Sequence, residues 1–185
     1  MMIRSLMWIL GGLVLGGIIH IVTVLGLPRF APEPAYQRIG AFAIDGQFSL
    51  LPRARPGVMP LPLLDPAMEH AVCRFSLANG PIRIRAEMPD LYWSIGLFDA
   101  SGLNVYSLSD RAAEQKPIDI LVANAEQIAA IRANPPDNFD TVIILDWASN
   151  EGFGMIRALD RTPGASKVIE NAIKAASCAP FALAQ

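Results

Sequence analysis

The chain has 185 residues, of which 52% are hydrophobic and 17% charged, and its formal net charge is −2. This length favours one domain with an appendage over two full domains. Because the sequence contains no run of Lys and Arg, it excludes the strongly basic class of nucleic-acid-binding proteins and a polybasic lipid-binding segment beside the N-terminal helix.

Residues 5–27 form an apolar segment of 23 residues without a formal charge when His20 is neutral. A helix of this length is about 35 Å long and would cross a hydrocarbon layer of about 30 Å. A cleaved signal peptide is the rival interpretation, but its apolar region usually has only about 7–15 residues and ends at a small-x-small site. Here the stretch closes with Leu25-Gly26-Leu27-Pro28. We therefore predict an uncleaved transmembrane anchor in residues 1–27, rather than a signal peptide or a buried helix of a soluble core.

The orientation of this anchor is not decided by its flanking charges. Arg4 precedes the helix, while Arg29 and Arg38 follow it, so the positive-inside rule is balanced. The short N-terminal tail favours retention inside, with the large domain exported.

Gly12, Gly16 and His20 recur at every fourth residue and share one face of the predicted helix. A Gly-x-x-x-Gly face lets a second helix approach closely, which would support a homodimer through the membrane helix. The alternative is that Gly is simply common in membrane helices and that His20 reaches the interface.

Residues 28–64 are rich in proline, which fixes φ and removes a hydrogen-bond donor. We predict an extended stalk and arm laid along the domain, with one short strand at 47–51. The prolines from here to the next predicted element are Pro28, Pro32, Pro34, Pro52, Pro56, Pro60, Pro62 and Pro66.

Residues 65–185 are predicted to form the β-rich domain. Asp65-Pro66 favours a short helical turn through about His70, and Asn79-Gly80 and residues 99–102 are turn signals. The alternating or apolar runs between them predict an antiparallel meander of four strands, at 72–77, 81–86, 91–98 and 103–108.

The second half of the domain mixes strands and helices. Asn124 with Gln127 predicts a capped helix that ends near Ala133, and Thr162 with Pro163 predicts the start of a C-terminal helix. That helix carries one apolar stripe and an i,i+4 pair, Glu170 and Lys174. We predict strands at 118–123, at 141–147 as a buried strand, and at 154–159 as its partner. The expected fold class is α+β, predominantly antiparallel β: a sandwich-like sheet with a C-terminal packing helix.

The two cysteines, Cys73 and Cys178, would form a disulfide if the domain is exported, because exported domains reside in oxidising compartments. If the domain is cytosolic, they would be two buried thiols that behave as small hydrophobic side chains.

No catalytic, cofactor or metal motif is present in the sequence. His70-x-x-Cys73 with Glu69 lacks the distant second pair of ligands that a zinc site needs. Asp99, Asp110, Asp146 and Asp160 fall at predicted strand ends. Two of them would serve a glycosidase-like scheme, but aspartate is also the ordinary turn residue.

Candidate ligand-binding residues are of two kinds. The pair Arg83 and Arg85 would bind an anion or form the solvated face of an edge strand. Aromatic side chains, including Tyr92 and Phe98, would line a groove or pack in the core. The candidate set is Arg83, Arg85, Trp93, Asn104, Tyr106, Asp110 and Arg111.

An ordered series of sequence blocks in residues 36–160 resembles the bacterial domain-of-unknown-function family numbered 1254, in its short, membrane-anchored proteobacterial form. This form is often found beside a protein of the companion family numbered 1214. The resemblance implies a β-rich fold and a place in the bacterial envelope. With the short N-terminal tail inside, we predict an anchor in the inner membrane and the domain in the periplasm. The resemblance implies no activity and no site residues. The blocks are Asp65-Pro-Ala-Met68, Cys73-Arg-Phe-Ser-Leu77, Gly80-Pro-Ile-Arg-Ile84, Tyr92-Trp-Ser-Ile-Gly-Leu-Phe-Asp99, Asn104-Val-Tyr-Ser-Leu108 and Asp110-Arg111.

Three hypotheses follow from the sequence. The first is a bilayer-anchored binding module without enzymatic activity, whose partner is the companion protein of the 1214 family. The second is an envelope hydrolase or carbohydrate-binding module with a groove near Asp110 and Arg111. The third is a secreted soluble protein after signal cleavage.

Overall fold

The computed structural model describes residues 2–27, 35–55, 57–114, 116–136, 139 and 141–182. The chain forms two compact units, Met1–Pro34 and Ala35–Gln185. The predicted helix stop at Pro28 lies outside the described residues.

The first unit is one helix, α1 (Met2–Gly26). Its stretch Ile3–Gly26 has 24 residues, a mean hydropathy of 2.2 and no buried side chains. At 1.5 Å per residue it is about 36 Å long, which suits a membrane span. The long apolar helix predicted at the N-terminus is therefore confirmed, and its length and composition fit a signal sequence or an anchor.

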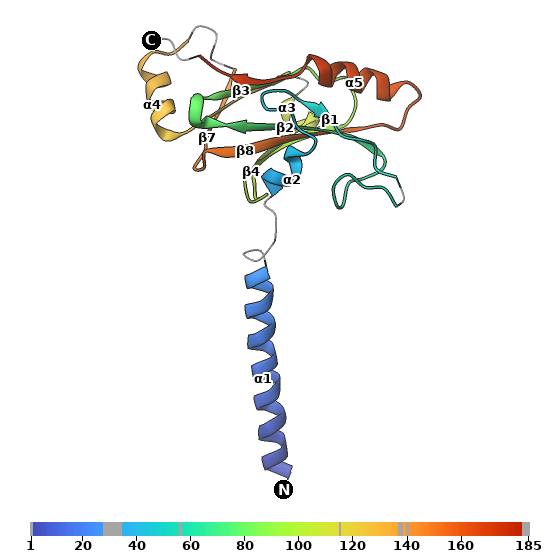
Figure 1. Ribbon diagram of the computed structural model, residues 1–185, viewed down its shortest axis with the longest axis vertical. Helices are drawn as coiled ribbons and strands as arrows, with labels where there is room; N and C mark the ends of the chain where they lie inside the picture. Colours follow the sequence, from blue (N-terminus) through green and yellow to red (C-terminus); the bar gives the residue numbers. More distant parts are fainter. Residues whose placement is uncertain are drawn as a thin grey trace. The chain divides into compact units, whose positions relative to one another are not determined.

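The second unit contains two mostly antiparallel sheets, which confirms the predicted α+β class (Figure 1). In the described part, one sheet has five strands in the order β1-β2-β8-β4-β5 and the other has four in the order β7-β6-β3-β9. The β6–β7 pair is parallel and the other pairs are antiparallel. The five-stranded sheet consists of β1 (Ser49–Leu50), β2 (Met68–Ser76), β8 (Glu151–Leu159), β4 (Trp93–Asp99) and β5 (Asn104–Ser109). The four-stranded sheet consists of β7 (Ile143–Asp146), β6 (Ile118–Ala123), β3 (Ile82–Ala86) and β9 (Ser177–Pro180).

The predicted four-strand meander is wrong, although its strands exist. β3 belongs to the other sheet, and only the β4–β5 hairpin pairs as expected, across a turn whose amides donate to the Asp99 carboxylate. β8 lies between β2 and β4 and pairs with both along its length. Local turn signals indicate where a strand ends, but they do not determine which sheet the next strand joins.

The predicted pairing of 141–147 with 154–159 is also wrong. β7 lies at the edge of the four-stranded sheet, parallel to β6, and its side chains are only partly buried. β8 instead occupies the interior of the five-stranded sheet. A β-branched, apolar sequence suits an edge strand and an inner strand alike, because both pack one face on a core.

Two helix starts also differ from the prediction. Asp65 accepts hydrogen bonds from the next residues and forms a turn, and β2 begins directly at Met68, where a helical turn was expected. α5 (Ala165–Ala175) begins after Gly164, which has φ +87°. In contrast, α4 (Ala125–Ala133) has the predicted capping box between Asn124 and Gln127.

The main core fills the space between the sheets and beneath α5. Its fully buried side chains come from both sheets, and α5 adds Ile169 and Ile173. The predicted pair Glu170–Lys174 forms on the opposite face of α5, with 2.6 Å between Oε1 and Nζ. Core members from the strands include Ile84, Ile95, Leu97, Ile120, Trp147 and Ile156.

A second core covers the outer face of the five-stranded sheet. It joins α2 (Ala35–Gly40) and the proline-rich segment to β2 and β8. The described part of residues 35–64 thus packs on the domain through its buried side chains, and it includes edge strand β1. The cluster contains Ile39, Leu51, Ala54, Leu64, Val72 and Phe153.

Candidate functional site

A pocket of about 610 Å³ opens where the chain twice crosses between the sheets. One wall is the connection 87–91 from β3 to β4. The other wall, between β5 and β6, consists of Asp110, Arg111, Glu114, Lys116 and Pro117. Each connection joins strands of different sheets, and residues of both line this pocket. The pocket therefore depends on β3 and β6 belonging to one sheet and β4 and β5 to the other.

Local chemistry shapes both walls. Trp93 begins β4 and is only 5% exposed, so its ring belongs to the main core as well as to the pocket. Asp110 begins the short helix α3 (Asp110–Ala113). The helix ends at Glu114 in the left-handed region with φ +52°, and the amide of Lys116 donates to Ala113. This tight turn brings Lys116 to the pocket wall.

The pocket is polar and carries more negative than positive charge. Four carboxylates line it, against two cations, Arg111 and Lys116. Lys116 is already partnered, because its Nζ lies 3.3 Å from Glu114 Oε2. The carboxylates are Glu87, Asp90, Asp110 and Glu114.

Asp110, which lines the pocket, has one carboxylate oxygen without a hydrogen-bond partner among the described residues. Its Oδ1 is buried, and within the described part of the chain it accepts no hydrogen bond. A buried acceptor without a partner costs about 1–3 kcal/mol. A ligand that donates a hydrogen bond to this oxygen would recover that free energy.

The structure brings three of the predicted ligand-binding residues into this pocket: Trp93, Asp110 and Arg111. It does not bring Asn104 and Tyr106 there. Asn104 accepts a hydrogen bond from Ser107, and Tyr106 packs against the main core.

Arg83 and Arg85 lie on β3, which is an inner strand between β6 and β9. Arg83 donates to both oxygens of Asp119, at 2.7 and 2.8 Å, and its side chain is only 15% exposed. Arg85 Nε lies 3.4 Å from the same carboxylate. Burial tends to raise the pKa of Asp119, but hydrogen bonds and charge from the two arginines outweigh it and lower that pKa. The Arg83 guanidinium is therefore engaged in a largely buried ion pair, while the Arg85 side chain stays 55% exposed.

The other predicted carboxylates do not converge on the pocket. Asp99 stabilises the β4–β5 turn, and Asp160 forms an ion pair with Arg53. The structure thus does not gather the four aspartates into an acid/base pair. Among the described residues no group of three or more His, Cys, Asp and Glu side chains is placed to hold a metal ion.

Sequence reasoning missed the wall formed by Glu87, Met88, Asp90 and Leu91, and it missed Lys116. The sequence did carry one indication of the wall at residues 87–91. Residues 87–91 combine two carboxylates with two apolar side chains in a connection that contains Pro89. Nothing local, however, indicates that residues 110–117 would lie opposite.

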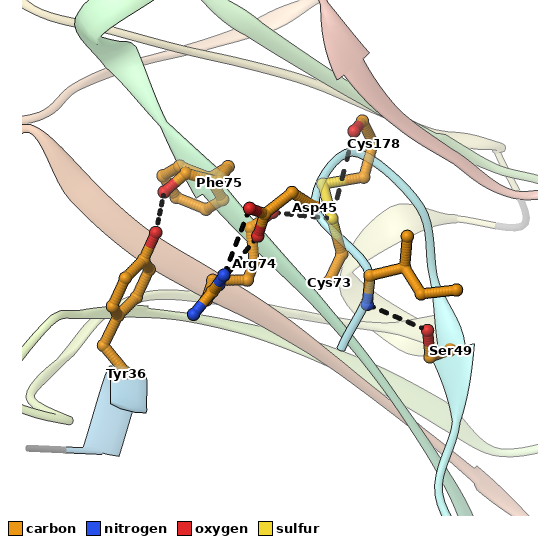
Figure 2. Close-up of polar contacts among 8 residues, drawn as sticks. Tyr36, Asp45, Ser49, Cys73, Arg74, Phe75 and Cys178 are labelled. Atoms are coloured by element: carbon orange, nitrogen blue, oxygen red, sulfur yellow. Dashed lines mark hydrogen bonds and ion pairs between the residues drawn. A yellow bond between two sulfur atoms is a disulfide. The ribbon is translucent and has the colours of Figure 1, made fainter. Parts of the chain in front are cut away.

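A second polar cluster fastens the start of the domain to β2 (Figure 2). Arg74 donates to Asp45 at 2.7 and 3.1 Å, and its guanidinium lies 4.8 Å from the ring centroid of Tyr36. The hydroxyl of Tyr36 donates to the carbonyl of Phe75. The hydrogen bond with Arg74 lowers the pKa of Asp45, as expected for a partnered carboxylate. This cluster positions residues 36–45.

Cys73 and Cys178 form a disulfide, and both are fully buried (Figure 2). The bond is consistent with an extracytoplasmic domain, and Cys73 has no thiolate to offer a metal. On α1, a Cβ added at Gly12 or Gly16 would meet no atom within 4 Å. The packing of a second helix against these glycines and His20 stays a prediction.

No protein-family model matches the chain, and no curated protein matches it either. Its fold is similar to that of the VPA0106 protein from Vibrio parahaemolyticus, with a TM-score of 0.51 and 15% identity over 64% of this chain and 29% of that chain. A second solved structure, an uncharacterized protein from Burkholderia cenocepacia, has a TM-score of 0.41 and 17% identity over 61% of this chain and 32% of that chain. The chain thus spans less than a third of the length of either protein. These likenesses concern the fold of distant bacterial proteins and do not establish the family resemblance found in the sequence blocks.

Proposed function

We propose that this protein is a membrane-anchored, extracytoplasmic binding module that holds a small hydrogen-bond-donating ligand in the pocket of Trp93, Asp110 and Arg111. The observation that carries the proposal is the buried, unpartnered Oδ1 of Asp110, a residue that lines a pocket of about 610 Å³. That volume lies in the range of small-molecule sites.

Two observations support the location. α1 has the length and composition of a membrane span, and the domain that follows contains a buried disulfide. Disulfides persist in oxidising compartments such as the bacterial periplasm. With the short N-terminus inside, the domain would lie in the periplasm, attached to the inner membrane.

The composition of the pocket supports a ligand rich in hydroxyl or ammonium groups. Asp110 would accept a hydrogen bond from the ligand, the surplus of carboxylates favours donors and cations, and the edge of Trp93 adds apolar contact. Arg111 would bind an acceptor on the same ligand. A carbohydrate meets these requirements, as does a short peptide with a free amine.

The location is tested by fusing alkaline phosphatase to the C-terminus and by washing membranes with carbonate. The anchor proposal expects phosphatase activity, retention in the carbonate pellet, and a mature N-terminus that still contains residues 2–27. Release by carbonate, or a mature chain that starts after residue 27, would instead indicate a cleaved signal sequence.

Ligand binding is tested by thermal unfolding of the full-length protein in nanodiscs, in the presence of monosaccharides, amino acids and short peptides. A ligand at 100 times its Kd stabilises the folded state by about 2.7 kcal/mol. We expect a stabilising compound whose effect is lost in Asp110→Asn and Arg111→Ala. Glu126→Gln changes an exposed carboxylate on α4, outside the pocket, and is the matched control. An effect that survives Asp110→Asn and Arg111→Ala alike would rule out the pocket as the binding site.

The companion of the 1214 family is a further proposal, which rests on the family resemblance alone. It is tested by co-purification of the two tagged proteins from solubilised membranes. A homodimer through Gly12 and Gly16 is tested in parallel by Gly12→Leu and Gly16→Leu, which would block close helix approach.

A further inference from the structure

We infer that residues 57–63, here called the apolar loop, contact the lipid headgroup region of the same membrane that holds α1. This inference rests on the proposed anchoring of the chain. The apolar loop presents Val58, Met59 and Leu63 to solvent, with exposed fractions of 68%, 48% and 97%. Several exposed apolar side chains in one loop are typical of a membrane or protein contact.

The backbone holds Leu63 outward. Its φ is +63°, in the left-handed region that non-glycine residues rarely adopt. Strained conformations of this kind persist where the surrounding structure enforces them, and they are concentrated at functional sites. A nearly fully exposed leucine in such a conformation contributes nothing to the core of its own domain.

Packing, an ion pair and backbone hydrogen bonds fix both ends of the apolar loop. Ala54 and Leu64, on either side of it, are buried in the second core. Arg53 forms an ion pair with Asp160. Arg55 and Val58 exchange two backbone hydrogen bonds, of 3.0 and 2.9 Å. The apolar side chains are thus displayed from a defined support, since the two ends of the loop are fixed.

The charges around the apolar loop suit a lipid surface. Residues 46–64 contain no acidic side chain, and Asp65, which follows them, is exposed and accepts a hydrogen bond from the amide of Ala67. Arg55 is exposed, and among the described residues it forms no ion pair. Apolar side chains flanked by a cation favour the boundary between headgroups and acyl chains, where the cation reaches phosphate.

The route of the chain favours the bilayer over another occupant. Ile39 of α2 belongs to the same hydrophobic cluster as Ala54 and Leu64. The apolar loop therefore extends from the same outer sheet face on which the chain enters the domain, and Figure 1 shows α2 and this loop on one side of the sheets. Eight residue steps separate Leu27 from Ala35 and can span at most about 29 Å, so a tether of this length would keep the start of an anchored domain near the bilayer.

The test uses the full-length protein in nanodiscs of phosphatidylcholine and phosphatidylglycerol. The photoreactive residue p-benzoylphenylalanine replaces Leu63 in one variant, Met59 in a second and Val168 in a control. Val168 is 51% exposed on α5, which packs on the opposite face of the five-stranded sheet. After irradiation, lipid adducts are quantified by mass spectrometry, and a non-reducing gel verifies that each variant forms its disulfide.

We expect several-fold more lipid adduct at positions 59 and 63 than at 168, and a further increase with the phosphatidylglycerol content. Equal adduct formation at 63 and 168 in a carbonate-resistant protein would overturn this inference and leave the anchoring intact. Adducts from position 63 to a second copy of the chain would overturn it as well. If the protein is washed out by carbonate, the anchoring fails and the lipid contact fails with it.

Discussion

Cys73 on β2 and Cys178 on β9 are bonded to each other across the two sheets, with 6.5 Å between their Cα atoms and a separation of 105 residues in the chain. The bond thus joins the five-stranded sheet to the last strand of the four-stranded sheet. It closes a very long loop in the unfolded chain, which reduces the entropy of that state.

Removal of the disulfide should destabilise the domain. We expect Cys73→Ala with Cys178→Ala to lower the free energy of unfolding by about 2–5 kcal/mol, measured by denaturant titration of the full chain in detergent. Wild-type protein unfolded in reductant is the control and should show a similar loss. An unchanged midpoint in both would mean that β9 is held by its strand pairing with β3 alone.

Gly152 should not tolerate a side chain. A Cβ at this position would lie 2.6 Å from Trp147, 2.8 Å from Phe75 and 2.8 Å from the carbonyl oxygen of Phe98. Gly152→Ala should cost about 1–3 kcal/mol through overpacking. Gly154→Ala is the matched control, since its nearest neighbour is the flexible end of Leu97 at 3.1 Å. An equal loss in both variants would show that the crowding at Trp147 is not the cause.

The ion pair of Arg83 with Asp119 should make stability depend on pH in the acid range. The folded-state pKa of Asp119 lies below its ordinary value of 3.8. The ion pair therefore contributes fully to the free energy of unfolding above pH 3.8, and this contribution is lost as the pH falls through the lower folded-state pKa. Asp119→Asn should cost about 1–3 kcal/mol at neutral pH and should reduce this acid dependence. Glu170→Gln, in the exposed pair on α5, should leave the free energy of unfolding unchanged. A flat acid profile in the wild type would refute the assignment.

His70 should add a separate pH dependence nearer to neutrality. It is 4% exposed, and burial together with the charge of Arg157 lowers its pKa below 6.5. The unfolded state binds the proton more readily than the folded state does. The free energy of unfolding is therefore highest above pH 6.5 and declines as the pH falls from 6.5 towards the folded-state pKa of His70. Melting temperatures measured between about pH 8 and pH 5 should therefore decline in the wild type and decline less in His70→Phe. Identical slopes would exclude His70 as the titrating group.

Leu63→Gly should stabilise the protein despite the loss of a large side chain. The left-handed backbone at Leu63 costs a non-glycine residue about 1–2 kcal/mol, while glycine gains entropy in the unfolded state worth about 0.4–1 kcal/mol. The net expectation is a gain of about 0.5–1 kcal/mol in chemical denaturation. Leu64→Gly, at the buried neighbour, should destabilise by contrast. A large loss in Leu63→Gly would mean that this side chain contributes to packing.

Several elements could be predicted because their information is local. The uncharged run of α1, the capping box of Asn124 and Gln127, and the turn at Asp99 each depend on neighbours within a few residues. Three of the seven candidate residues, Trp93, Asp110 and Arg111, line one pocket, and their role in ligand binding stays a prediction. The sequence did not indicate that the opposite wall of the pocket, from Glu87 to Leu91, would face them, because it lies on another connection between strands.

The amino-acid sequence by itself thus determined the apolar helix, most strand positions and the α+β class, because hydrophobic period and turn chemistry act over short distances. Only the tertiary structure decided that β3 leaves the sheet of β2 and β4, that β8 inserts between them, and that β7 pairs with β6. These strand pairings depend on contacts between residues far apart in the chain. The arrangement that packs the shared core best is the one that forms. The pocket and the pairing of Arg83 with Asp119 follow from the same strand pairings.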